Sequence, residues 1–195
     1  MMNTLPDFFD FLVMERNKIK SLPDGFEIHE GYFPERMEEI GRFRIRAWRN
    51  ENGINPTFFS QDVWIDSLDK NAHHWIITKE EVIVAAARLS FHECIEEVPY
   101  ADFLHDEHRP LFQKSPIASI NRLVVDPAFR GRGFARILDN ERINEAAKSG
   151  SKIMIAFPQL SRLVHLQKLG FNLISQLENI PEMPERPFFL MKLDL

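Results

Sequence analysis

The sequence has one cysteine, two tyrosines and no long apolar run among its 195 residues. Because Cys94 has no second cysteine to pair with, no internal disulfide forms and nothing calls for an oxidising compartment. No apolar stretch approaches the roughly 18 residues that a membrane span needs. Residues 1–20 carry Asp7, Asp10 and Glu15 and lack the basic start of a signal peptide. We therefore expect a cytoplasmic protein without a membrane partner.

The chain also lacks an excess of positive charge. It has 24 Lys and Arg against 29 Asp and Glu, a formal net charge of −5. Nucleic-acid binding relies on clustered basic residues, so this balance argues against a nucleic-acid partner. It leaves room for a small anionic ligand in a local basic pocket. The length and the apolar content of 44% predict one globular domain.

Sequence periodicity gives the organisation. Apolar spacing within residues 5–20 and the turn sequence SLPDG that follows predict an accessory helix in residues 1–22, ahead of a single domain at 23–195. Within that domain we expect the following helices and strands: helices from Pro34 to about Asn50, at 133–149 and at 159–169; strands at 25–32, 74–79, 82–91, 117–125, 152–157, 171–177 and 187–195. This order predicts an α/β (α+β) fold, a central mixed and mostly antiparallel sheet flanked by helices.

The segment RLVVDPAFRGRGFARIL at 122–138 joins a predicted strand to a predicted helix. The N–H groups of a first helical turn have no partners within the helix, and with the helix dipole they attract anions. Gly131 and Gly133 let the main chain approach a phosphate closely. Three arginines add charge-assisted donors: Arg130, Arg132 and Arg136. The segment predicts a pyrophosphate site; the alternative is a glycine-rich turn with solvated arginines.

Two other phosphate-binding patterns fit less well. A Walker sequence needs a lysine after its second glycine, and none follows Gly133. A dinucleotide-binding fingerprint needs a third glycine where Arg136 stands. Both interpretations are set aside.

The pattern Arg130-x-x-Gly133-x-Ala135, after a Val-x-Pro strand exit, resembles the coenzyme A signature of the GNAT superfamily of N-acyltransferases. The spacing to KIMIAF at 152–157 and the sequence HLQKLGF at 165–171 agree with this resemblance. It implies a GNAT-like fold over residues 26–195. It also implies an enzyme that moves an acetyl group from acetyl-CoA to a primary amine of a small molecule or peptide by direct attack. No metal is implied, and a homodimer is one option.

The resemblance also implies the residues that hold coenzyme A. The main-chain amides from Gly131 to Arg136 would hold the pyrophosphate, and the exposed edge of Leu123 to Val125 would pair with the pantetheine. An N–H near Val124 or Val125 would polarise the thioester carbonyl. The full implied set is Leu123, Val124, Val125, Arg130, Gly131, Arg132, Gly133, Phe134, Ala135, Arg136 and Gln159.

The chain departs from the family pattern at three positions. Gln159 stands where an asparagine is common, and Arg162 stands where a small alanine is usual. Leu166, next to His165, replaces the tyrosine that commonly protonates the departing thiolate. A thiol with a pKa of about 8–9 leaves reasonably well unprotonated, so we expect an active enzyme rather than an inactive relative.

The general base and the acceptor site are less constrained. The predicted strand 117–125 contains no glutamate. The candidates for the base are His92, Glu93, Asp126, His73 and His74, each of which can equally be a surface or hydrogen-bonding residue.

Two residues are predicted to contact the acceptor, Arg44 and Trp48. Arg44 falls on the apolar arc of its helix and suits an acceptor carboxylate, or pairs with a nearby carboxylate of the chain itself. Two other functions stay open. Ser119-Ile-Asn-Arg122 partly resembles the Glu-Leu-Ser-Arg run of acyl-homoserine-lactone synthases and related N-acyl amino acid synthases, which use longer acyl donors. Leu166 favours a non-catalytic CoA-binding regulatory module.

Overall fold

The structure is a computed structural model that describes residues 22–49 and 51–195. The predicted accessory helix of residues 1–22 lies almost wholly outside the described residues. The described part contains one seven-stranded sheet in the order β1-β2-β3-β4-β5-β7-β6, and only the β4–β5 pair is parallel. The strands are β1 Glu27–Gly31, β2 His73–Lys79, β3 Val82–His92, β4 Ile117–Val125, β5 Ile153–Ala156, β6 Asn172–Leu177 and β7 Phe188–Asp194. The predicted fold class is confirmed.

Within residues 22–49 and 51–195, three α-helices accompany the sheet: α2 Met37–Arg49, α3 Phe134–Lys148 and α4 Leu163–Gln167. The helix predicted at 159–169 is split into the 3₁₀ helix η7 Leu160–Arg162 and α4. The other 3₁₀ helices are η1 Pro56–Phe59, η2 Ser67–Asn71, η3 Ile95–Glu97, η4 Ala101–Phe103, η5 Asp106–Phe112 and η6 Pro127–Phe129. Three of them lie in the long connection between β3 and β4. Among the described residues no helix has the length and apolar character to cross a membrane.

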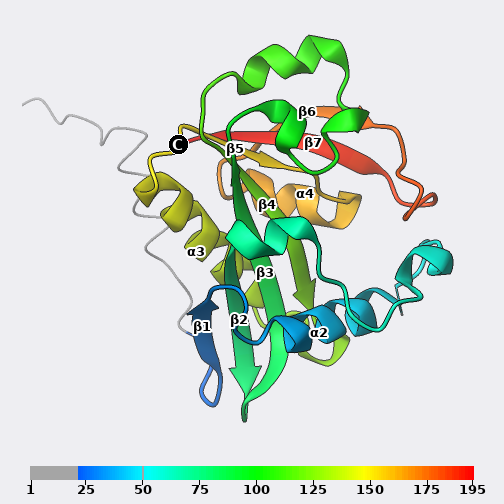
Figure 1. The fold of residues 1–195 in the computed structure, drawn as a ribbon, viewed down its shortest axis with the longest axis vertical. Helices are drawn as coiled ribbons and strands as arrows, with labels where there is room; N and C mark the ends of the chain where they lie inside the picture. Colours follow the sequence, from blue (N-terminus) through cyan, green and yellow to red (C-terminus); the bar gives the residue numbers. More distant parts are fainter. Residues whose placement is uncertain (1–21, 50) are drawn as a thin grey trace, which may run out of the picture.

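The helices cover both faces of the sheet (Figure 1). On one face, α2 packs Met37, Ile40 and Phe43 against the β2–β4 strands. The connection between β3 and β4 covers the same face farther along, over β5 and β7. On the other face, α3 and α4 pack on the sheet through residues such as Phe134 and Leu166. In Figure 1, β2–β4 run along the long axis of the molecule whereas β7 crosses it, so the two halves of the sheet diverge.

The divergence leaves one edge of β4 open. β4 pairs with β5 only from Ile117 to Ile120, and the rest of β4 pairs with β3 alone. A bulge interrupts this second pairing, with Arg122 in the left-handed region at a φ of 53°. Because a bulge shifts the alternation of side chains by one residue, Val124 joins the core under α2 although Ile120 faces α3.

Candidate active site

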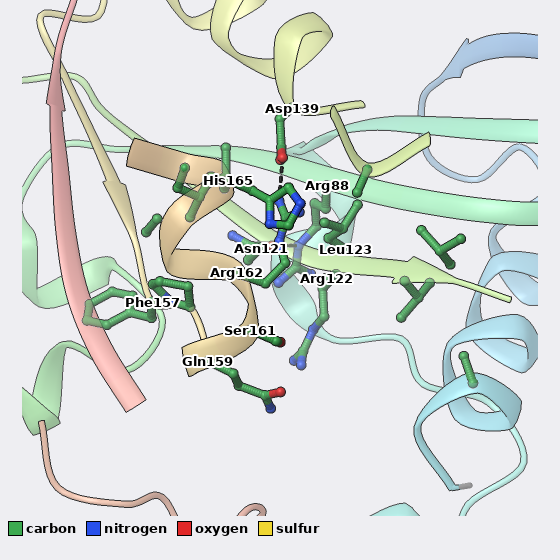
Figure 2. A pocket seen from close by; sticks show the side chains of 18 of the residues that line it. Arg88, Asn121, Arg122, Leu123, Asp139, Phe157, Gln159, Ser161, Arg162 and His165 are labelled. Carbon is green, nitrogen blue, oxygen red and sulfur yellow. Dashed lines mark hydrogen bonds and ion pairs between the residues drawn. The ribbon is translucent and has the colours of Figure 1, made fainter. Parts of the chain in front are cut away.

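A cavity of about 620 Å³ lies where β4 and β5 separate. It is lined from α2, β4, the start of α3, the chain between β5 and α4, and the connections before β4 and β7 (Figure 2). Its charge is opposite to that of the chain as a whole. Seven arginines line it against two carboxylates, Glu51 and Asp139, although the protein carries a net charge of −5. The cavity is therefore built for anions.

The outer end of the cavity is the glycine turn before α3. Asp126 caps η6 by accepting a hydrogen bond from the N–H of Ala128 at 2.9 Å. Gly131 and Gly133 follow with φ of 78° and 91°, backbone conformations that residues with a side chain rarely adopt. Gly133 is the N-cap of α3 and offers no side-chain cap, so the first amides of a 15-residue helix are left for a ligand. A Cβ built on Gly131 meets no atom within 4 Å, so the approach to this turn is open. These features fit a diphosphate.

Ten of the eleven predicted coenzyme residues line the cavity. They are Leu123, Val124, Val125, Arg130, Gly131, Gly133, Phe134, Ala135, Arg136 and Gln159. The exception is Arg132, whose guanidinium lies 5.8 Å from the ring centroid of Phe26 and 5.7 Å from that of Phe129. Arg132 therefore supports the turn from outside the cavity.

Glu51 links the outer end to the chain before β7. Its carboxylate accepts hydrogen bonds from Arg130 and, at 2.9 Å, from Arg186. Arg186 also donates to the Gln159 side-chain oxygen at 2.8 Å. Burial would raise the pKa of Glu51, but the two arginines lower it below the ordinary value. Glu51 thus stays ionised and fixes two cations at the rim. Trp48, a residue predicted to contact the acceptor, also lines the cavity.

The open edge of β4 forms the middle of the cavity. Residues 123–125 line it and have no partner strand on the β5 side. Across from them, Leu166 is buried and also lines the cavity, so an aliphatic side chain stands where the resemblance implies a phenol. His165 lines the cavity as well and is solvent-exposed.

The inner end rests on a buried network of arginines and aspartates. The 3₁₀ helix η2 begins with a capping box in which Asp66 and Asp69 hold each other's backbone. Asp69 accepts hydrogen bonds from Arg44 at 2.9 Å and from Arg88 at 2.9 Å. Asp66 accepts from Arg88 and, at 2.7 Å, from Arg122. Burial would raise the pKa of both carboxyls, yet the arginines lower it below the ordinary value.

A second group of charges approaches the same place from α3. Arg142 is fully buried and donates to the backbone oxygens of Arg88 and Asn121, each at 3.2 Å. Both residues lie at the bulge between β3 and β4. Arg142 also pairs with Asp139, and Asp139 pairs in turn with Arg162. Figure 2 shows Arg88, Asn121 and Arg122 gathered near Arg162 and Asp139.

None of the predicted base candidates lines the cavity. His92 is buried, and its Nε2 atom lies 2.9 Å from Ser90 Oγ. The same hydroxyl accepts a hydrogen bond from Asn121, so Ser90 stands between His92 and the cavity-lining Asn121. Glu93 accepts from Ser115 on the exposed surface, and Asp126 is occupied as a cap. His73 contacts Glu30, and the Nε2 atom of His74 lies 3.0 Å from the backbone oxygen of Asp69.

Arg44 is not in the cavity either. It is 1% exposed and paired with Asp69, the second of the two arrangements expected for it. Burial lowers the pKa of Arg44 to about 10, which keeps it protonated at neutral pH.

Sequence reasoning missed several residues that do line the cavity. Tyr100, one of two tyrosines in the chain, projects from the connection between β3 and β4. Burial raises the pKa of Tyr100 and the neighbouring Arg122 lowers it in part, so the phenol stays protonated at neutral pH. The length of that connection was the available signal. The polar residues missed include Glu51, Arg88, Asn121, Asp139, Arg142 and Arg186.

The family model described as the acetyltransferase (GNAT) family matches residues 27–171. Among solved structures, FeeM, an N-acyl amino acid synthase from uncultured soil microbes, is similar at 14% identity and a TM-score of 0.64, covering 87% of this chain and 90% of that one. Escherichia coli ElaA is similar at 17% identity and a TM-score of 0.62, covering 87% and 99%.

A third structure carries a bound ligand. YncA, a putative acetyltransferase from Salmonella typhimurium with its cofactor acetyl-CoA, is 16% identical at a TM-score of 0.54, covering 88% of this chain and 95% of that one. At such identities these likenesses show the fold alone. No curated protein sequence matches this chain.

Proposed function

Because this chain belongs to the acetyltransferase (GNAT) family, we propose that it transfers an acetyl group from acetyl-CoA to the primary amine of a small molecule or peptide. The observation that supports this proposal is that one cavity contains both the glycine turn before α3 and the open edge of β4. The glycine turn at the start of α3 leads directly into the open edge of β4. One end suits a diphosphate and the other suits an extended amide chain.

The residues present fit coenzyme A. The amides from Gly131 to Arg136 would hold its diphosphate, with Arg130 and Arg136 as charged donors. The unpaired main chain of residues 123–125 would bond its pantetheine amides. When bound, the thioester supplies the activated acyl group. N–H groups on the open edge would stabilise negative charge on a carbonyl oxygen placed there.

The charge of the cavity explains how an amine is made nucleophilic without a dedicated base. Among the described residues, its carboxylates Glu51 and Asp139 are each held by two arginines. Positive neighbours disfavour an ammonium ion, so they lower the pKa of a bound amine and favour its neutral form. The amine then attacks directly, having lost its proton to solvent.

Protonation of the leaving thiolate does not involve position 166, since leucine carries no proton to donate. Tyr100 is the phenol that lines the cavity, and its raised pKa keeps it a proton donor at neutral pH. In this proposal Tyr100, from the connection between β3 and β4, takes the role of the tyrosine that is absent at position 166. Transfer without a general acid remains the alternative, because thiolates are stable leaving groups near pH 8.

A second candidate function uses longer acyl donors. An aromatic wall of Tyr100, Phe157 and Phe188 lines the cavity beyond the strand opening, with ring centroids 5.2–6.2 Å apart. Such a wall suits an alkyl chain, and the similar structure FeeM is an N-acyl amino acid synthase. Comparing acetyl-CoA with a series of longer acyl-CoA donors separates the two candidates. A kcat/KM that rises with chain length would favour the second.

The proposed function is tested at Gly133. Gly133→Asp puts a carboxylate against the predicted diphosphate, and like charges in contact cost several kcal/mol, so coenzyme A affinity should fall by about 100-fold or more in calorimetry. Gly150→Asp is the matched control. Gly150 has a φ of 82°, its added Cβ meets no atom within 4 Å, and it does not line the cavity. Equal affinities in the two variants would contradict the proposal.

A further inference from the structure

The inner end of the cavity holds more positive charge than its own carboxylates balance. In the part of the chain that the structure describes, five guanidinium groups share three carboxylates there. The guanidiniums belong to Arg44, Arg88, Arg122, Arg142 and Arg162, and the carboxylates to Asp66, Asp69 and Asp139. Arginine keeps its charge, so the inner end carries a surplus of about two positive charges.

Neither His74 nor Glu51 removes this surplus. His74 contacts Arg44 and Asp69, and burial lowers its pKa, so it is neutral at pH 7 and adds no charge. Glu51 is committed to Arg130 and Arg186 at the outer end. A buried surplus of charge is costly, and an anionic ligand relieves the cost. The phosphates of coenzyme A belong at the glycine turn, so the anion required here comes from the acceptor.

Arg122 has the capacity to bind that anion. It lines the cavity with 16% of its side chain exposed, whereas Arg88 and Arg142 are each 1% exposed. Asp66 accepts from its Nη2 atom and Tyr100 also contacts its side chain, whereas its buried Nε atom has no hydrogen-bond partner among the described residues. The guanidinium lies 3.8 Å from the ring centroid of Trp64, and this stacking fixes its plane.

The backbone places Arg122 beside the reacting position. Arg122 directly precedes Leu123, where the open edge of β4 begins, and its positive φ turns its side chain to the face that carries Arg88 and Asn121. A group held by Arg122 therefore shares one cavity with the proposed site of the thioester carbonyl. An amino acid, which carries both an amine and a carboxylate, can occupy both places at once.

From these observations we propose that the acceptor is a primary amine that carries a carboxylate, of the amino acid class, and that Arg122 binds the carboxylate. The inference rests on the proposed acyl transfer. The positive surplus would then serve two purposes at once, since it holds the carboxylate and favours the neutral amine. The carboxylate preference first attached to Arg44 thereby moves to Arg122, which lines the cavity whereas Arg44 does not.

The first experiment compares acceptors on the unmodified protein. Amino acids are paired with their own carboxamides, which keep the amine and the side chain but lose the negative charge, and thiol release from acyl-CoA donors is followed. A charge-assisted hydrogen bond corresponds to about 10- to 100-fold, so kcat/KM should favour the acids by that factor. Calorimetry on the coenzyme A complex should show the same preference in binding.

The second experiment uses Arg122→Gln, with Arg42→Gln as the control. Arg42 pairs with Glu38 on the exposed side of α2, outside the cavity. Arg122→Gln should remove most of the preference for acids over amides while coenzyme A affinity stays unchanged, and Arg42→Gln should leave both unchanged. Arg122→Lys should restore part of the preference.

The outcomes separate the two proposals. Acids and amides accepted equally by the unmodified protein would overturn the carboxylate site and leave acyl transfer standing. A preference for acids that survives Arg122→Gln would overturn the role of Arg122. Failure to bind coenzyme A at all would overturn the proposed function, and the acceptor inference with it.

Discussion

The two ends of the cavity present positive charge by different physical means. The outer end uses main-chain amides at the start of α3 and solvent-facing arginines such as Arg130, which is 51% exposed. The inner end uses arginines held by Asp66, Asp69 and Asp139, of which Arg44, Arg88 and Arg142 are almost wholly buried. A local stretch of sequence can therefore form the outer end, whereas the inner end depends on the whole fold. Charge at the two ends should accordingly differ in its effect on stability and in its response to salt.

The largest effect is expected from breaking the inner network at Asp69. Asp69→Asn keeps the shape of the side chain and removes the charge that balances Arg44 and Arg88. Loss of one partner of a buried ion pair typically costs about 3–5 kcal/mol, so urea denaturation should show a loss of that size. Asp62→Asn is the control, because Asp62 is 83% exposed and lies 4.0 Å from Arg49. An Asp69→Asn protein as stable as this control would show that the network does not support the fold.

The stability of the inner end should also depend on pH, with a definite sign. The pKa of Asp66 and of Asp69 is lowered in the folded protein, and so is the pKa of His74 and of His92. The unfolded chain therefore takes up protons at higher pH than the folded one, and stability falls as the pH falls.

Thermal melting checks this dependence. The loss should begin as the pH drops through 6.5, where unfolded histidines protonate, and should grow below 3.8, where unfolded aspartates protonate. His74→Asn should remove part of the first phase. A melting temperature that rises between pH 7 and pH 5 would contradict the assignment of neutral, buried histidines.

The smallest effect is expected from salt, and it separates the two ends. Exposed charges are screened within a Debye length of about 10 Å at 0.1 M salt, whereas buried charges are screened much less. Raising salt from about 50 mM to about 500 mM should weaken coenzyme A binding by roughly tenfold in calorimetry. The preference for carboxylate acceptors should change by less than about twofold. Equal sensitivity of both quantities would remove the distinction between the two ends.

How much the sequence predicts follows the same division. The strands, the three helices and the glycine turn depend on local periodicity and turn chemistry, and the structure has them within a few residues of the predicted bounds. The open edge of residues 123–125 was expected from the family resemblance, and the short β4–β5 pairing agrees with it.

The inner end was not predictable in this way. Arg44 was placed on the apolar arc of its helix, and its partner Asp69 lies 25 residues away in a 3₁₀ helix that no periodicity announces. His92, Glu93 and Asp126 were predicted as base candidates because their side chains can accept protons. In the structure His92 is buried, Glu93 accepts a hydrogen bond from Ser115 on the surface, and Asp126 caps a 3₁₀ helix. Tyr100 reaches the cavity because the connection between β3 and β4 folds over the sheet, an arrangement fixed by tertiary packing.

The bulge in β4 has a consequence for how this protein can diverge. One extra residue turns Arg122 toward the face that carries Arg88 and Asn121 and, in the same step, sets which backbone atoms of positions 123–125 lie on the open edge. Deleting a residue there would swing the guanidinium to the α3 side and shift the donor register together. With the proposed roles of Arg122 and of residues 123–125, selectivity for the acceptor and positioning of the donor would be inherited as a unit, and new specificities should arise by substitution around this strand rather than by changes in its length.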